Sequence, residues 1–326
     1  MTGAVLPSGV RWEDTIRALA DRGWGHADFD RNQMAYAAEL VLGLPGSGRE
    51  RWETYWRTVS RLSQTLNAAG ITGVFLKSRR HYPYHDTNVD ILIAREDWER
   101  TIQVLDAGAW QIPSAAVRFK QNMVERSKLK LPSRDKTLVP AHLYGAVTWR
   151  YQSDVGFLPN SGHEGVWLEQ IRMEDAAGGP FPGGDSEILV PTFAADLLIH
   201  AAQTVFENYR LFLGEALFFD YLMRVIPGPA QESLQRLADA RGAASVLETA
   251  RHLAREELSG LLAQPGSRWP VRVSWDRLWR CWWDRAVWRF QAGKTIRGAE
   301  ELAGYLLFAV LYTGKRQGWD RLRGRR

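Results

Sequence analysis

The chain has 326 residues, of which 45% are hydrophobic and 24% are charged, and this balance is typical of a globular protein. Its single cysteine, Cys281, excludes an internal disulfide and any zinc site built from cysteines, and it fits a reducing compartment. The longest apolar stretch, 305–312, is too short to span a bilayer, and residues 1–10 lack the pattern of an export signal. We therefore expect a cytoplasmic protein with no membrane partner.

The net charge of +5 is a mild bias toward polyanionic partners. Part of it lies at the C-terminal end, where one acid, Asp320, stands among Lys315, Arg316, Arg321, Arg323, Arg325 and Arg326. Such a tail fits contact with nucleic acid or nucleotide phosphates, and it equally fits a solvated terminus. The charge alone does not decide between these two interpretations.

Residues 1–70 are predicted to form an N-terminal helical region. Between 50 and 70, apolar side chains recur at helical spacing, which predicts a helix with one buried face. These residues are Tyr55, Trp56, Val59, Leu62 and Leu66. Gly70 follows them and is typical of a helix stop.

The segment 71–175 is predicted to be an α/β core. Short apolar runs that predict strands lie at 71–76, 89–93, 117–120, 127–131 and 137–151. Between the second and third runs, 94–110 returns to helical spacing. Pro140 argues for an edge position or a break in the last run.

A stretch rich in glycine and proline, 176–185, predicts a linker. Beyond it, 186–326 is predicted to be a C-terminal helical region, with strongly apolar helical segments at 191–224, 243–262 and 275–290. The predicted fold class is therefore α+β, a small mixed sheet with helices between two helical regions.

Chemistry-bearing side chains cluster around the first two predicted strands. The first is followed by Lys77-Ser78-Arg79, and the second opens with Asn88-Val89-Asp90. Because side chains alternate along a strand, Asn88 and Asp90 share a face, which suits a pair of oxygen ligands for a divalent cation. Asp90 has two other interpretations: a carboxylate paired with a nearby lysine or arginine, or one at the exposed edge of a sheet.

These residues resemble the signature of the polymerase-β nucleotidyltransferase superfamily, and within it the group called uncharacterised nucleotidyltransferases. Lys77-Ser78 stands where that group has lysine-glycine, Tyr82-Pro83 matches its tyrosine-proline, and Asn88-Val89-Asp90 occupies its Asp-x-Asp position. Weaker matches follow at 139–143, 190–202 and 218–222. The resemblance covers roughly half to two thirds of the chain.

The resemblance implies a polymerase-β-type core and magnesium-dependent transfer of a nucleotide from a nucleoside triphosphate. The acceptor is unknown, and a nucleic acid, a protein and a small molecule all remain open. Asp90 and Asn88 would be catalytic, and both would bind magnesium with Asp86 as a third ligand. Lys77, Ser78 and Arg79 would contact the phosphates, although a solvated basic loop is an equal interpretation of these three residues.

Two departures from the family pattern leave the reaction open. The first aspartate of the motif is Asn88, and Ala141 stands where the third is expected. Two of three metal carboxylates are therefore replaced. Asp86, His85 and His142 lie close to the matched positions in sequence and could serve as metal ligands in their place. The alternative function is a catalytically inactive nucleotidyltransferase fold that serves as a binding module or scaffold.

Two further features could belong to a functional site, but a structural role in the hydrophobic core is the favoured interpretation of both. The tryptophans 275, 279, 282 and 283 suit base stacking, but their spacing favours one buried helix face. His200 lies in an apolar helix, where a hydrogen-bonded core histidine is favoured over a catalytic base.

Overall fold

A computed structural model describes residues 11–124, 128–145, 148–149, 153–154, 168–178, 186–208, 210–263, 270–293, 295–296, 298–300 and 302–306. Most of the predicted linker and the basic residues of the C-terminal tail lie outside the described residues.

A mixed six-stranded sheet forms the centre of the fold, with the strand order β3-β4-β2-β1-β8-β7. The strands are β1 (Gly73–Leu76), β2 (Val89–Ile93), β3 (Lys128–Leu131), β4 (Ala141–Tyr144), β7 (Leu168–Arg172) and β8 (Glu187–Pro191). β1 pairs parallel with β8 and β2 parallel with β4, while the other neighbours are antiparallel. The predicted α+β class is confirmed.

Two short ladders accompany this sheet. β5 (Thr148–Trp149) pairs with β6 (Ser153–Asp154), and β9 (Arg210–Leu211) pairs with β10 (Val271–Arg272). β8 falls in the segment 186–326, which the sequence predicts to be helical, and yet it lies inside the main sheet. The sheet therefore extends beyond the core segment that the sequence predicted.

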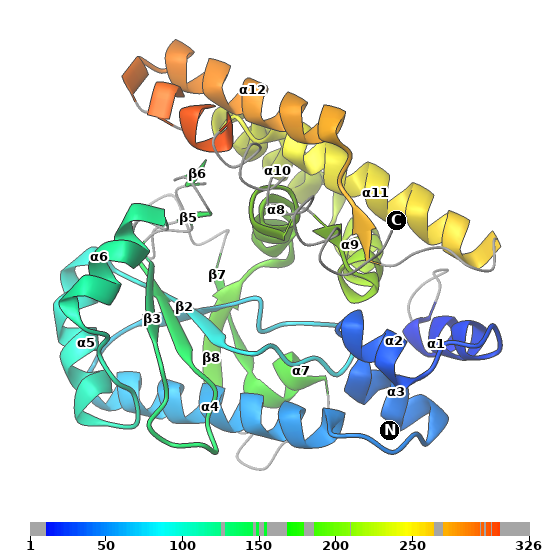
Figure 1. The fold of residues 1–326 in the computed structure, drawn as a ribbon, viewed down its shortest axis with the longest axis horizontal. Coiled ribbons are helices and arrows are strands. Elements are labelled where there is room, and N and C mark those ends of the chain that lie inside the picture. Colours follow the sequence, from blue (N-terminus) through cyan, green and yellow to red (C-terminus); the bar gives the residue numbers. More distant parts are fainter. Residues whose placement is uncertain are drawn as a thin grey trace, which may run out of the picture.

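The N-terminal helices precede the sheet in sequence. They are α1 (Trp12–Ala20), α2 (His26–Arg31), α3 (Ala35–Leu42) and α4 (Gly48–Ala68). α4 packs against β1 and β2. It runs along one face of the sheet (Figure 1), and its predicted apolar face is buried. The chain leaves α4 through Gly70, whose φ of +63° is the conformation expected for a glycine stop.

After β2 the chain forms η1 (Arg95–Asp97), α5 (Trp98–Ala107) and α6 (Ala115–Val124). The strand predicted at 117–120 is wrong, because this segment belongs to α6. Ser114 begins the helix by accepting from the Val117 N–H through Oγ, at 3.4 Å, and its carbonyl accepts from the Arg118 N–H, at 2.9 Å. Val117 and Phe119 suggested a strand, but both are exposed.

The C-terminal helices lie on the other face of the sheet (Figure 1). They follow the short α7 (Met173–Ala177) and are α8 (Phe193–Gln203), α9 (Leu213–Val225), α10 (Gly228–Ala240), α11 (Ala244–Ala263) and α12 (Trp275–Gln291). The apolar run 191–224 is not one helix. The π-helical turn η3 (Thr204–Asn208) and β9 separate α8 from α9.

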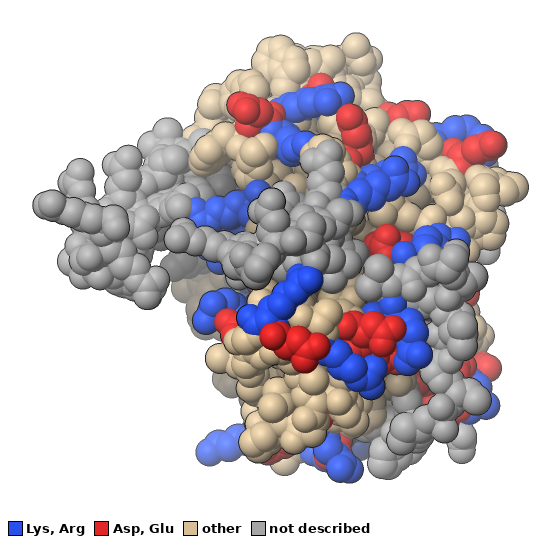
Figure 2. Space-filling view, turned by 90° about the vertical axis from the view of Figure 1, so that its right-hand side faces the viewer, with Lys and Arg blue, Asp and Glu red and all other residues tan. Residues whose placement is uncertain are grey.

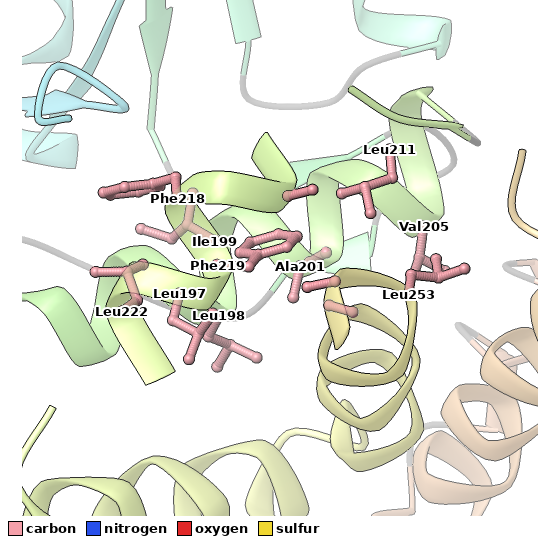
Figure 3. Packing of buried hydrophobic residues seen from close by; sticks show 14 of the residues in the cluster. Leu197, Leu198, Ile199, Ala201, Val205, Leu211, Phe218, Phe219, Leu222 and Leu253 are labelled. Atoms are coloured by element: carbon pink, nitrogen blue, oxygen red, sulfur yellow. The ribbon is translucent and has the colours of Figure 1, made fainter. Parts of the chain in front are cut away.

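Two hydrophobic clusters occupy the two faces of the sheet. Neighbouring residues of β2 belong to different clusters, with Ile91 packing toward α4 and α5 and Leu92 toward the C-terminal helices. Figure 3 shows part of the cluster that contains Leu92, where Leu198 of α8, Phe219 of α9 and Leu253 of α11 converge. The central strand β2 is thus buried on both sides.

Within the part of the chain that the structure describes, no helix combines the length and the apolar character needed to cross a bilayer.

Candidate functional site

The candidate site forms where β1 ends beside the start of β2. Lys77 directly follows β1 and has a φ of +58°, a left-handed conformation that is uncommon for a residue with a side chain. The antiparallel register pairs Leu76 with Asp90, so Lys77 leaves the strand next to this carboxylate.

Asp90 is 2% exposed and contacts three side chains. Its carboxylate forms an ion pair with the Lys77 ammonium. The Asn88 amide donates to Asp90 Oδ1 at 2.7 Å, and His142 Nδ1 lies 3.2 Å from the same oxygen. The prediction that Asn88 and Asp90 share a face is confirmed, and the structure adds Lys77 and His142 to the pair.

The surroundings of Asp90 keep its carboxylate ionised. Burial by itself would raise the pKa of Asp90, but the nearby Lys77 charge and the hydrogen bond from His142 outweigh burial and hold the pKa below its usual range. Lys128 of β3 acts in the same direction from further away. The negative charge of Asp90 is therefore matched by cations of the protein itself.

The residue opposite Asp90 on the neighbouring strand is His142. The parallel register pairs Asp90 with His142 and Val89 with Ala141. Ala141 belongs with Val89 to the hydrophobic cluster on the opposite face of the sheet. Ala141 therefore does not share the face of Asp90, whereas His142 does, because neighbouring residues of a strand point to opposite faces.

Asp86 makes hydrogen bonds to residues close to it in sequence. Its carboxylate accepts from the Tyr84 hydroxyl at 3.1 Å and from the Thr87 N–H at 2.7 Å. Within the described ranges, no group of three or more histidine, cysteine, aspartate or glutamate side chains is placed to hold a metal ion. The residues that are present do not fit a two-metal centre, because a lysine ammonium neutralises the carboxylate that would bind the ions.

Ser78 and Arg79 are both engaged elsewhere. Ser78 is buried, donates to the Leu76 carbonyl at 3.2 Å and lies 3.0 Å from the Tyr55 hydroxyl. Arg79 forms an ion pair with Glu169 of β7, and its guanidinium carbon lies 3.5 Å from the centre of the Phe193 ring. Of the three residues expected at the phosphates, only Lys77 lies beside Asp90.

Two lysines that the sequence analysis did not select share the Asp90 face. The register of β3 with β4 pairs Lys130 with His142 and Lys128 with Tyr144. The Lys128 ammonium lies 4.9 Å from the centre of the Tyr144 ring. The alternation Lys-Leu-Lys-Leu at 128–131 carried this signal, because it places both lysines on one face of the strand.

A second polar cluster lies between the sheet and the helices. Arg80 is buried, its Nη1 lies 2.6 Å from His200 Nε2, and its guanidinium stacks over Tyr84 and Phe218. Burial and the Arg80 charge lower the pKa of His200 to about 4, while Asp196, 3.4 Å away, acts against them. His200 is therefore a neutral, hydrogen-bonded core histidine, as its apolar helix favoured.

The tryptophans of α12 do not form a single buried face. Trp282 is fully buried and stacks on Tyr305 with ring centres 5.1 Å apart. Trp275, Trp279 and Trp283 are 42%, 45% and 51% exposed. The expectation of one buried face is thus confirmed for Trp282 and wrong for the other three.

The basic excess of the chain does not gather into one patch on the face drawn in Figure 2. There the described lysines and arginines lie beside aspartates and glutamates. We compared the chain with models of protein families, with curated proteins and with solved structures, and none of the three comparisons gave a match.

Proposed function

We propose that the chain is a binding module on a nucleotidyltransferase-like core, and that it binds a nucleoside triphosphate without a divalent cation and without transferring the nucleotide. One observation carries the proposal: the ammonium of Lys77 and the imidazole of His142 contact the carboxylate that would otherwise bind metal. A divalent cation would have to displace Lys77 from Asp90 and would find few oxygen ligands there.

The charge of the site suits phosphate. Lys77 pairs with Asp90, and Lys128 and Lys130 lie on the same face of the sheet, so these four described side chains carry three positive charges and one negative charge. In nucleotidyltransferases magnesium neutralises the phosphates. Lysines supply the same sign of charge from the protein itself, and charge-assisted bonds from them to phosphate oxygens are strong.

Magnesium-dependent nucleotide transfer is the competing proposal, and one observation favours it. The low pKa of Asp90 keeps this carboxylate ionised and thus able to bind a cation. This function requires Lys77 to withdraw and Asp86 or another oxygen ligand to approach. The two proposals therefore differ in whether nucleotide binding needs magnesium.

The deciding experiment is calorimetric titration with ATP, GTP, CTP and UTP, in magnesium and in EDTA, with pyrophosphate release measured in parallel. We expect at least one nucleotide to bind equally well in EDTA, about tenfold more weakly to Lys130→Gln, and with no pyrophosphate release. Lys136→Gln, in the exposed turn before β4, is the matched control.

The outcomes separate the proposals. Binding that needs magnesium, disappears in Asp90→Asn and is followed by pyrophosphate release would establish the transferase and overturn the binding module. If no nucleotide binds under either condition, both nucleotide proposals are wrong.

A further inference from the structure

One level of the sheet changes from polar to apolar across its width. The strand registers pair Lys130 of β3 with His142 of β4, and His142 pairs with Asp90 of β2. Asp90 pairs with Leu76 of β1, and Leu76 belongs to the hydrophobic cluster of the C-terminal helices. Because paired residues share a face, the polar side chains at this level lie on the side of these helices.

The apolar part of this level continues across β8 and β7. β1 and β8 are parallel with Val74 opposite Leu189, which places Leu76 opposite Pro191 two residues further along. Pro191 pairs with Leu168 of β7, and Leu168 packs against the same hydrophobic cluster as Leu76. Two strand spacings, about 10 Å, therefore separate Leu76 from the β7 end of this level.

A small pocket opens at this apolar end. It has a volume of about 230 Å³ and lies between the end of β8 and the starts of α8 and α10. Phe193, Ile226 and Pro227 make its lining mainly apolar, and Glu169 of β7 adds a carboxylate. Sites for whole small molecules have volumes of about 300–1,000 Å³, so this pocket suits one ring system of a larger ligand.

Arg79 links the pocket to Lys77. Lys77 and Thr192 directly follow the parallel strands β1 and β8, so both leave the sheet at the same end, and Thr192 lines the pocket. Two residues after Lys77, Arg79 pairs with Glu169, and its guanidinium carbon lies 3.5 Å from the centre of the Phe193 ring. Lys77 and the pocket are therefore neighbouring parts of one region.

We propose that this pocket holds the base of the nucleotide whose phosphates lie at Lys77 and Lys130, and that it favours a base with an exocyclic amino group. This inference rests on the function proposed above. The base packs against Phe193 and Ile226, which bury its ring. A carboxylate in an ion pair only accepts hydrogen bonds, so Glu169 suits the amino groups of adenine, cytosine and guanine and disfavours the ring oxygens of uracil.

A comparison of ATP with inorganic tripolyphosphate tests the contribution of the base, because tripolyphosphate lacks base and sugar. Affinities are measured by calorimetry on the full chain, in EDTA and in magnesium. We expect ATP to bind at least tenfold more tightly than tripolyphosphate. Ala230→Leu, which fills the pocket from the first turn of α10, should weaken ATP about tenfold and leave tripolyphosphate unchanged. Ala240→Leu, at the exposed end of the same helix, is the matched control and should change neither affinity.

Two matched pairs of nucleotides test the role of Glu169. CTP and UTP, and likewise ATP and inosine triphosphate, differ by an amino group in the first and an oxygen in the second. We expect the amino-bearing member of each pair to bind about tenfold more tightly, and Glu169→Gln to abolish this difference. The ratio within a pair is insensitive to a general loss of affinity from breaking the ion pair with Arg79. Because the Glu169 side chain is 35% exposed, this variant tests the pocket even if Ala230→Leu fails to fold.

The outcomes separate this inference from the proposed function. If tripolyphosphate and nucleotides bind and both weaken in Lys130→Gln, but Ala230→Leu matches Ala240→Leu or ATP binds no more tightly than tripolyphosphate, the pocket does not hold the base and the proposed function stands. Equal affinities within both pairs would overturn the preference for an amino group. If neither tripolyphosphate nor any nucleotide binds, the proposed function is wrong and this inference fails with it.

Discussion

Lys77 has both an unfavourable backbone conformation and a nearly buried charge. Its φ is +58°, and its side chain is 11% exposed beside the fully enclosed Asp90. A non-glycine residue in this conformation costs on the order of 1 kcal/mol or more, and it persists where the surroundings hold it. The ion pair with Asp90 is one contact that holds Lys77 in this conformation.

Removing one partner of this pair should destabilise the protein more than removing both. Asp90→Asn removes the negative charge that pairs with the Lys77 ammonium, and Lys77→Met leaves the buried carboxylate with its contacts to Asn88 and His142 but without its ion pair. We expect each single variant to lose roughly 3–5 kcal/mol of unfolding free energy, and the double variant to lose clearly less than their sum. Urea unfolding of all four proteins measures this coupling.

The exposed pair Arg49–Glu53, with atoms 2.9 Å apart, provides the control cycle. It should show a coupling below about 1 kcal/mol. If losses at Lys77 and Asp90 were simply additive, the two side chains would not act as a pair, and the main argument against metal binding would fail.

Glu215 should make stability fall as the pH rises. Burial raises the pKa of its carboxyl to about 7, against the hydrogen bond from the Phe212 N–H and the charge of Arg80. Between its unfolded pKa of about 4.5 and 7, the folded state holds a proton that the unfolded state has released, so the unfolding free energy decreases with pH.

Glu215→Gln removes this titration and keeps an acceptor for the Phe212 N–H. Its unfolding free energy relative to the wild type should therefore increase between pH 4.5 and 7.5, by up to about 3 kcal/mol. Urea unfolding at intervals of half a pH unit provides the measurement. A difference that does not change with pH would mean that Glu215 is ionised in the folded protein.

The sequence predicted part of the site and missed the residues that determine its charge. Alternation along a strand was sufficient to place Asn88 beside Asp90. The contact with His142 depends on the register between β2 and β4, which segments far apart in sequence establish together. A lysine partner for Asp90 was one of the alternatives, but choosing it required the backbone conformation of Lys77.

The turn between α10 and α11 depends on a glycine for two separate reasons. Gly242 has a φ of +62°, and a Cβ atom there would lie 2.6 Å from the Trp288 side chain. Gly43, which ends α3, has a similar φ of +65°, but a Cβ atom there would meet no heavy atom within 4 Å. Substitution of Gly43 therefore tests the backbone conformation alone, whereas substitution of Gly242 tests the backbone conformation and the contact with Trp288 together.

We expect Gly43→Ala to cost about 1 kcal/mol of unfolding free energy, from the backbone alone. Gly242→Ala should cost about 1–3 kcal/mol more, because Trp288 must also shift. Thermal and urea unfolding of the two variants give the difference. Equal losses would mean that the contact with Trp288 is not tight.

The sequence predicted helices and strands correctly where one periodic pattern of apolar residues dominated. The prediction failed where the pattern was short or where one apolar run contained several elements. The long helix α4 was clear because several buried residues repeat along it. At α6, Val117 and Phe119 outweighed the helix-forming alanines in the prediction, although both side chains are exposed. In 191–224 the uniformly apolar composition hid the π-helical turn that divides it.

The first helical region is not an independent unit, because it shares a core with the C-terminal helices. Ile16, Phe29 and Met34 pack in the same cluster as α8, α9 and α11. The Leu213 N–H donates to the Asn32 side chain at 3.4 Å, and the Gly214 N–H donates to the Asn32 carbonyl at 3.3 Å. These contacts join the start of the chain to the start of α9.

The sheet is the physical link between the two hydrophobic clusters. Ile91 and Leu92 are neighbours in β2, fully enclosed on opposite faces. We expect Ile91→Ala and Leu92→Ala each to lower the free energy of unfolding by about 2–5 kcal/mol, because each change leaves a cavity in a packed core. Since β1, β2, β4, β7 and β8 each contribute residues to both clusters, we expect the loss on one face to weaken the other face equally.

Native-state hydrogen exchange, read on separate peptides, tests this coupling. In Leu92→Ala, the opening free energy of the slowest amides should fall by the same amount in α9, on the mutated face, and in α4, on the opposite face. Ile91→Ala should give the same equality with the faces reversed. If Leu92→Ala lowered protection in α9 and left α4 unchanged, the C-terminal helices would open as a separate unit above an intact sheet.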